Sequence, residues 1–297
     1  MKKSFKGLLR LTRFNEYAWF VIVSTILGIT SAKGQFDWRF VVVLVANWLA
    51  VRFAFTVNLI ENAPDDALSP DITHHNPISA GWISPKAARI WSVVAVLLAL
   101  LLFALLGWFP LLLGSLTLAL GYFYSAKSVR LISKAFLNII TQSLMLAGLQ
   151  FLTGYFSYQT HLTRQWFWPF LFVIAIAIYA SLTYGNYLIK SSSHSTANDL
   201  DGKTSHALIL VVLLAGLFSG YMSFVMLNLI PLWVILVMLV IAAILLLPLI
   251  LRSRQGDTRA NLQTSLLGPL IQAAAIALLL QYVLPWLNQL VKMGIFN

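Results

Sequence analysis

The chain has 297 residues, of which 60% are hydrophobic and only 10% are charged, so it is not expected to be a soluble globular protein. It contains no cysteine, which excludes disulfide bonds and thiolate metal sites. Its formal net charge of +11 predicts no nucleic-acid partner, because contact with anionic lipid and an uneven distribution of basic residues across a membrane account for it.

Apolar stretches long enough to cross a bilayer as helices recur along the whole chain. They predict an all-α polytopic membrane protein with about nine transmembrane helices and a single domain over residues 1–297. The first stretch is expected to be a permanent helix and not a cleaved signal peptide, because many more spans follow it. The predicted spans are roughly 16–33, 37–60, 87–107, 109–125, 132–154, 167–189, 205–227, 230–251 and 264–290.

The distribution of basic residues predicts the orientation of these spans. The N-terminus and the even-numbered connections carry most of the Lys and Arg residues, and the other side carries only Lys33, Arg39, Arg164 and Lys292. Because cytoplasmic segments are enriched in Lys and Arg, the N-terminus is expected in the cytoplasm, with a bacterial inner membrane as the expected location.

Six of the nine acidic residues lie in two short polar segments, one after the second span and one after the sixth. They are Glu61, Asp65, Asp66 and Asp71 in the first segment, and Asp199 and Asp201 in the second. Each segment is followed, two helices later, by a basic cluster on the same side. This pattern suggests two parallel four-helix halves with a ninth helix appended, and a site at the cytoplasmic face where the halves meet.

The residue types in these segments indicate a particular ligand chemistry. Carboxylates and carboxamides provide the hard oxygen ligands that Mg²⁺ prefers, and Mg²⁺ bridges them readily to phosphate oxygens. Nearby Lys and Arg residues would neutralise a departing diphosphate, and an apolar bundle would accommodate an isoprenoid tail. The two segments therefore predict a magnesium-assisted prenyl diphosphate site.

Three sequence motifs resemble those of the UbiA superfamily of intramembrane prenyltransferases. The first is Asn58-Leu-Ile-Glu-Asn62-Ala-Pro-Asp-Asp66 at the end of the second span. The second is the run over residues 76–84, Asn-Pro-Ile-Ser-Ala-Gly-Trp-Ile-Ser. The third combines Tyr124-Ser125 with Arg130-Leu131 and Asn138. The resemblance implies a two-lobed helical bundle, Mg²⁺, an isoprenyl diphosphate donor and a lipophilic acceptor.

The first motif departs from the family pattern in ways that leave its register open. Leu59 stands where an aspartate is expected, and Asn62 replaces the central aspartate. Pro64 interrupts helical hydrogen bonding, so either Asp66 or the pair Glu61 and Asp65 could face the metal.

The second motif is harder to align. Family members place aspartates at four-residue intervals before a glycine and a threonine. Counted back from Gly202, those positions are Asn198, His194 and Lys190. With a one-residue deletion they become Asp199, Ser195 and Ser191. Lys190 and Lys203 could replace a second metal with fixed positive charge.

The resemblance implies a set of residue roles. Asp66 and Asp199 are the expected catalytic residues, and the expected substrate-binding residues are Asn58, Tyr124, Lys127, Arg130 and Lys190. The expected metal ligands are Asn58, Asn62, Asp66, Asp199 and Asp201. The predicted reaction is transfer of a prenyl group to an apolar or aromatic acceptor in contact with membrane lipid. The alternatives are a catalytically impaired member that binds isoprenoid lipids or acts as a scaffold, and a terpene cyclase.

Overall fold

The computed structural model describes residues 7, 10–11, 14–68, 76–191, 202–254 and 262–293. Within these ranges, the side chains of residues 14–16, 135, 184–191, 202–205, 251–254 and 262–266 are outside the description. All regular secondary structure in the described residues is helical. The prediction of an all-α protein is therefore confirmed.

The helices follow the predicted spans closely. Their bounds are α2 Phe14–Ser31, α3 Trp38–Asp66, α5 Pro85–Leu106, α6 Trp108–Ser125, α7 Ala135–Ser143, α8 Leu149–Phe156, α9 Phe167–Ser191, α10 Gly202–Tyr221, α11 Leu232–Arg254 and α12 Leu262–Lys292. Short segments η1 Leu131–Ser133, η2 Leu144–Gly148 and η3 Met222–Met226 lie beside α7, α8 and α10.

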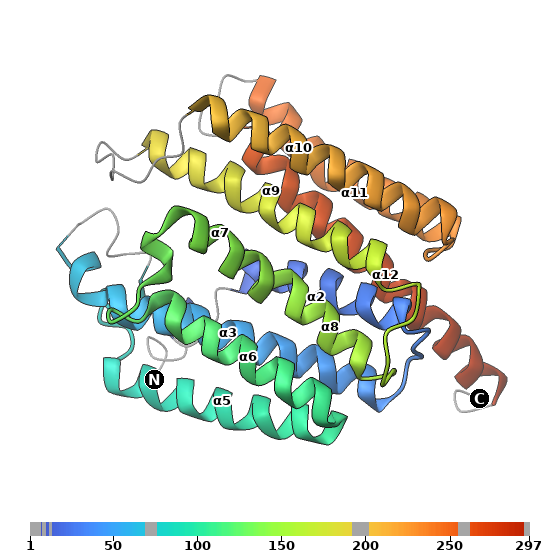
Figure 1. The fold of residues 1–297 in the computed structure, drawn as a ribbon, viewed down its shortest axis with the longest axis horizontal. Coiled ribbons are helices and arrows are strands. Elements are labelled where there is room, and N and C mark those ends of the chain that lie inside the picture. Colours follow the sequence, from blue (N-terminus) through green and yellow to red (C-terminus); the bar gives the residue numbers. More distant parts are fainter. Residues whose placement is uncertain are drawn as a thin grey trace.

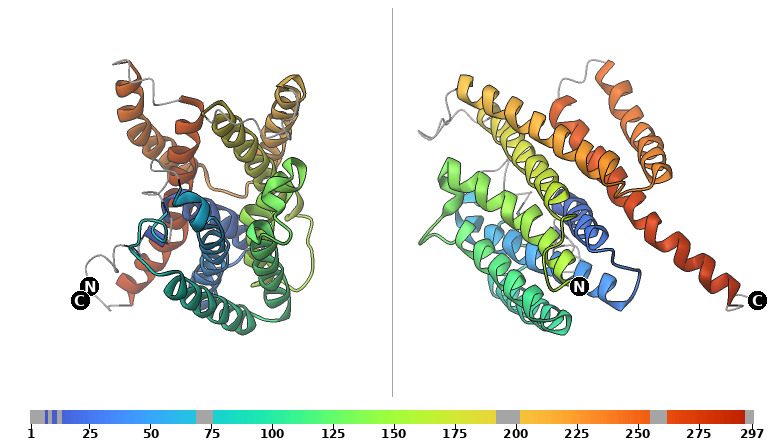
Figure 2. Two further views of the ribbon diagram at one scale, coloured as in Figure 1. Left: turned by 90° about the vertical axis from the view of Figure 1, so that its left-hand side faces the viewer. Right: turned by 45° about the vertical axis from the view of Figure 1, so that its right-hand side comes forward.

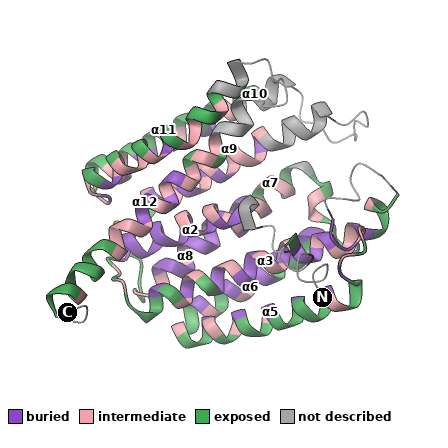
Figure 3. Ribbon diagram, turned by 180° about the vertical axis from the view of Figure 1, so that it is seen from behind, coloured by how far each residue is buried: buried purple, intermediate pink, exposed green. Residues whose placement is uncertain are grey.

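The surface of the bundle is apolar enough to face lipid. Among the described residues, seven helices are long and apolar enough to cross a membrane, and two shorter apolar helices cover Tyr17–Ser31 and Phe167–Thr183. Leu97, Leu101 and Leu105 of α5 are each more than half exposed, and the outer faces of α10 and α11 are similar (Figure 3). Such a surface belongs in hydrocarbon, and the chain is an integral membrane protein.

The connections separate to opposite ends of the bundle. Figure 1 shows that α3, α6 and α9 finish at the left-hand end, and that α2, α8 and α10 finish at the other. We call the first end the α3 end, because α3 finishes there at Asp66. The predicted alternation of the connections is thus present in the fold.

Helix α2 lies in the middle of the bundle and packs against α3, α8, α9 and α12 (Figure 2). Two glycines allow α2 and α8 to approach closely. A Cβ atom at Gly28 would collide with the backbone carbonyl of Phe151, and one at Gly154 would collide with that of Thr25. Close helix contact through small residues is a common way to gain packing energy in lipid, where no hydrophobic force brings helices together.

A buried polar cluster ties α2, α3 and α8 together. The Asn47 side chain donates hydrogen bonds to Thr25 Oγ1 at 2.8 Å and to the Gln150 carbonyl at 3.2 Å. Its amide oxygen accepts from Thr153 Oγ1 at 2.8 Å. Asn47 therefore connects helices, one of the two roles that a polar residue inside a span suggests. Arg52, one turn further along α3, lies 5.5 Å from the Trp48 ring centroid.

The fifth predicted span, 132–154, is not one regular α-helix. It is divided into α7, the π-helical segment η2 and α8. Gln150 Nε2 donates to the Met145 carbonyl at 2.7 Å, five residues earlier, which satisfies a backbone acceptor where the regular ladder is interrupted. A π-helical segment has no distinctive sequence pattern, so periodicity alone predicts a single helix here.

Helix α12 is more than an addition to two four-helix halves. It packs against the central α2 as well as α9 and α11. Tyr282 places its hydroxyl 3.0 Å from Thr30 Oγ1 and its ring 4.9 Å from Phe40. The ninth predicted helix is thus part of the core that surrounds α2.

Candidate functional site

The first motif occupies the last turns of α3. The helix continues through Pro64 to Asp66, so Asn58, Asn62 and Asp66 follow one another at four-residue intervals along one face. Pro64 is exposed in the last turn of α3, and the helix continues past it although its missing N–H removes one backbone hydrogen bond. Pro64 therefore does not end the helix before Asp66.

Hydrogen bonds join the first two residues of this row to each other and to α6. Asn62 Nδ2 donates to Asn58 Oδ1 at 3.4 Å, and Asn58 Nδ2 donates to Ser125 Oγ at 3.2 Å. Ser125 is buried at the end of α6. The Asn58 side chain is therefore directed from α3 toward α6.

Asp66 is held by a buried asparagine from the segment that leads into α5. Asn76 is only 1% exposed, and its Nδ2 donates to Asp66 Oδ2 and to the Leu59 carbonyl, both at 2.8 Å. Its Oδ1 accepts from the Ile78 N–H at 3.0 Å. Asn76 thus fixes the Asp66 carboxylate relative to the last turns of α3.

The alternative pair Glu61 and Asp65 occupies a different face of the same turns. Asp65 is exposed and Glu61 is half-buried, whereas the neighbouring Ala63 is buried. In the row, the Asn58 side chain contacts α6 and the Asp66 side chain contacts the 76–84 segment. The geometry therefore favours this row as the one directed into the bundle.

A second hydrogen-bonded group lies directly beside Ser125. Tyr124 is largely buried at the end of α6, and its hydroxyl donates to Asn138 Oδ1 at 2.9 Å. The same hydroxyl accepts from Gln142 Nε2 at 2.7 Å. The polar side chains of α3 and α7 thus contact two consecutive residues at the end of α6, Ser125 and Tyr124 respectively.

Two predicted phosphate-binding cations lie in the α6–α7 connection. Lys127 and Arg130 are both exposed, and neither forms an ion pair with a carboxylate of the described residues. Arg130 has a φ of 45°, and its carbonyl accepts from Ser133 Oγ at 2.8 Å. The connection is therefore a tight turn with two exposed cations, a few residues after Tyr124.

The second motif cannot be placed in the same way. Asp199 and Asp201 lie outside the described residues, and Lys190 is within α9 but its side chain is not described. Helix α9 is described to Ser191 and α10 from Gly202, and the end of α9 and the start of α10 lie at the α3 end (Figure 1).

The donor set of the first motif fits a hard divalent cation. One carboxylate, from Asp66, and the amide oxygens of Asn58 and Asn62 are the ligand types that Mg²⁺ accepts, and Mg²⁺ usually completes its shell with water and phosphate oxygens. No cluster of three or more His, Cys, Asp and Glu side chains occurs in the part of the chain that the structure describes. The ligands expected at this row are thus amides, one carboxylate and a bound phosphate.

Sequence reasoning did not assign roles to Asn76 or Gln142. Asn76 precedes Pro77, and an asparagine at such a position often accepts a hydrogen bond from the backbone two residues later, as it does here with Ile78. That signal predicts the turn, but not the contact with Asp66. Gln142 lies four residues after Asn138, a helical spacing that places both on one face of α7.

Comparisons with known proteins agree with this architecture. Residues 19–268 match the model of the UbiA prenyltransferase family. No curated protein sequence gives a significant match.

Solved structures of low identity share the fold. A structure described as giving insights into digeranylgeranylglyceryl phosphate synthase is 17% identical, with a TM-score of 0.63 over 94% of this chain and 98% of that chain. A UbiA homologue from Archaeoglobus fulgidus bound to GPP and Mg²⁺ is 18% identical, with a TM-score of 0.61 over 92% of this chain and 99% of that chain. An apo UbiA homologue from Aeropyrum pernix K1 is 19% identical, with a TM-score of 0.61 over 87% of this chain and 96% of that chain.

The family model spans most of the chain, and the folds agree over nearly the full length of the solved homologues. The chain belongs to the UbiA prenyltransferase family.

Proposed function

We propose that the protein transfers a prenyl group from an isoprenyl diphosphate to an apolar or aromatic acceptor, with Mg²⁺ as cofactor. The observation that carries this proposal is the row of oxygen donors on α3. Its Asn58 is hydrogen-bonded to the end of α6, and the two exposed cations of the α6–α7 connection follow that end and form no ion pair with a described residue. The A. fulgidus homologue bound to GPP and Mg²⁺ supports the same chemistry for this fold.

The residues divide into two groups under this proposal. Asn58, Asn62 and Asp66 hold the cofactor, and Asp199 and Asp201 supply further carboxylates from the second motif. Bound Mg²⁺ would supply positive charge that stabilises the diphosphate as it departs. Asn76 keeps the Asp66 carboxylate in a fixed position.

The basic residues act on the leaving group. Lys127, Arg130 and Lys190 offset negative charge that builds up on the diphosphate as the bond between its oxygen and C1 of the prenyl chain breaks. Tyr124 orders the α6–α7 side of the site through Asn138 and Gln142. The electron-rich acceptor then forms a bond to C1 and loses a proton.

Radiolabelled geranylgeranyl diphosphate tests the transfer reaction in membranes that contain the protein. The expected result is a labelled lipid that lacks the diphosphate and differs from free prenyl alcohol, together with released diphosphate. Membranes carrying Asp66→Asn should lose most of this product. Labelled hydrocarbon formed by the purified protein without an acceptor would instead identify a cyclase.

A non-catalytic member of the family is the second candidate. The observation that favours it is the single carboxylate in the α3 row, because each missing metal-bound carboxylate normally costs transition-state stabilisation. Such a protein would bind the prenyl diphosphate and yield no labelled product in the same assay.

A further inference from the structure

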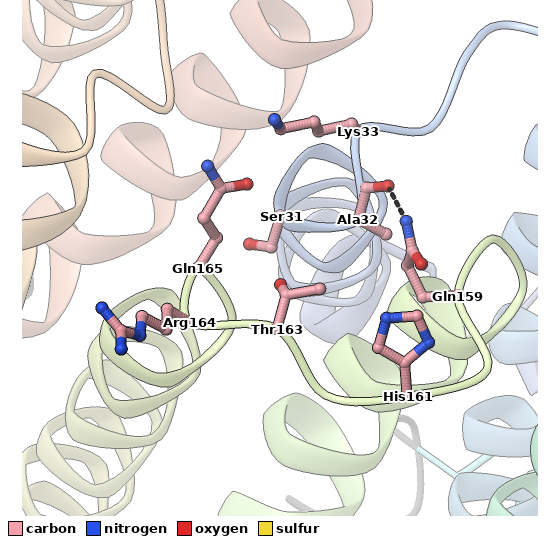
Figure 4. A pocket seen from close by; sticks show the side chains of 8 residues that line it. All are labelled: Ser31, Ala32, Lys33, Gln159, His161, Thr163, Arg164 and Gln165. Atoms are coloured by element: carbon pink, nitrogen blue, oxygen red, sulfur yellow. Dashed lines mark hydrogen bonds between the residues drawn. The ribbon is translucent and has the colours of Figure 1, made fainter.

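A polar pocket lies at the end of the bundle opposite the candidate site. It has a volume of about 420 Å³ and lies between the end of α2 and the α8–α9 connection (Figure 4). Its polar lining residues are Ser31, Lys33, Gln159, His161, Thr163, Arg164 and Gln165. The pocket is therefore lined by two cations, a histidine and neutral hydrogen-bonding groups.

The positive charge of this pocket has no ion-pair partner in the part of the chain that the structure describes. Neither Lys33 nor Arg164 forms an ion pair with the described residues. Asp37 is the only acidic residue in the connections at this end, and it does not line the pocket. Its Oδ1 already accepts from the N–H groups of Arg39 and Phe40 and from the Tyr158 hydroxyl. The lining thus favours an anion.

Two positive charges in one pocket are unexpected at this end of the bundle. Among the described residues, the end of the bundle opposite the α3 end carries only Lys33, Arg39, Arg164 and Lys292 as Lys or Arg residues. Two of these four line one pocket.

The loop that carries Arg164 is held by a buried tyrosine. Tyr155 is fully buried, and its hydroxyl lies 3.1 Å from the His161 carbonyl and 3.0 Å from Thr163 Oγ1. It also accepts from the Thr163 N–H at 2.9 Å. Gln159 fixes the other wall, because its Nε2 donates to the Ala32 carbonyl at 3.1 Å. The pocket is therefore preformed.

The pocket lies at the level of the membrane where lipid head groups are found. Helices α3, α6, α9 and α11 begin at this end, and each carries a tryptophan in its first turn or just before it. These residues are Trp38, Trp108, Trp166 and Trp233. Tryptophan belts mark the interface between hydrocarbon and water, where the phosphates of membrane lipids lie.

We propose that this pocket binds a phosphate group, and that the head group of an anionic phospholipid supplies it. Lys33 and Arg164 contribute charge-assisted hydrogen bonds to the phosphate oxygens, with Thr163 and Gln165 as neutral donors. This site is independent of the proposed prenyl transfer, because it lies at the opposite end of the bundle.

Native mass spectrometry of the detergent-purified chain tests the proposal with three probes. Phosphatidylglycerol is the anionic lipid, diacylglycerol is its phosphate-free counterpart, and glycerol phosphate is the soluble source of the same group. We expect phosphatidylglycerol to bind more tightly than diacylglycerol. Lys33→Gln combined with Arg164→Gln should weaken its binding by about ten- to a hundredfold.

A control variant removes two positive charges from the same end of the bundle but leaves the pocket unchanged. Arg39→Gln with Lys292→Gln should leave phosphatidylglycerol binding unchanged, and each single pocket variant should show an intermediate loss. If glycerol phosphate also binds and the same variants lose that binding, the pocket is a phosphate site and a soluble molecule supplies the phosphate. Equal phosphatidylglycerol affinity in the parent and the double pocket variant, or an equal loss in the control, would overturn the proposal.

Discussion

At the scale of single residues, Asn76 shows how a neutral side chain can organise a charged one. It is buried and contacts Asp66, the Leu59 carbonyl and the Ile78 N–H at once. Each of these partners would lose a hydrogen bond if the amide were removed, and an unsatisfied buried group costs about 1–3 kcal/mol. The position of Asp66 therefore depends on a residue outside the motif itself.

The Asn76→Ala variant is expected to lower the thermal stability of the detergent-purified protein and to weaken its affinity for geranylgeranyl diphosphate. Ser79→Ala is the matched control, because Ser79 Oγ donates to the Ala63 carbonyl at 2.8 Å and so joins the same segment to α3 without contacting Asp66. We expect Ser79→Ala to affect stability more than ligand affinity. Equal losses of affinity in both variants would show that Asn76 only stabilises the turn.

At the scale of helices, the contact between α2 and α8 depends on the absence of a side chain at two positions. Gly28→Ala should destabilise the protein by about 1–3 kcal/mol, because the new methyl group meets the rigid backbone of Phe151. Thermal unfolding in detergent measures the effect. Gly216→Ala on α10 should be neutral or stabilising, since its Cβ would lie 3.5 Å from Ala175 Cβ, an ordinary contact.

The connections at the pocket end are joined by a hydrogen bond that depends on pH. Burial, and then the hydrogen bond to Asp37, raises the pKa of Tyr158 above its ordinary value of 10.0. A group whose pKa is raised by folding contributes stability that is complete below its unfolded pKa and is lost as pH rises. We expect thermal stability to fall above about pH 10 and to fall less steeply in Tyr158→Phe. Parallel pH profiles for the two proteins would rule out this contribution.

The sequence predicts the helices well because lipid leaves few alternatives for an apolar chain. It also places Asn58, Asn62 and Asp66 at helical spacing, and the structure confirms that they share a face of α3. Periodicity does not predict the contact between Asn76 and Asp66, because it joins residues across a connection. The same holds for the pocket beside Lys33 and Arg164, since neither residue belongs to a recognisable motif.

At the scale of the whole molecule, the separation of basic residues between the two ends predicts a single orientation in the membrane. The absence of native cysteine allows a direct measurement. Ser133→Cys and Thr160→Cys each introduce one thiol at an exposed position, on opposite ends of the bundle. A membrane-impermeant maleimide should label Thr160→Cys in intact bacterial cells, and Ser133→Cys only after lysis. The reverse pattern would invert the proposed orientation.

The central claim is that the α3 end holds an isoprenyl diphosphate through the Asn58, Asn62 and Asp66 row. The most direct test is binding of geranylgeranyl diphosphate to the purified protein, with and without Mg²⁺, for the parent, Asp66→Asn and Asp37→Asn. We expect affinity that depends on Mg²⁺, is lost in Asp66→Asn and persists in Asp37→Asn, whose carboxylate lies at the opposite end. Binding that is absent from the parent, or is indifferent to both Mg²⁺ and Asp66, would contradict the claim.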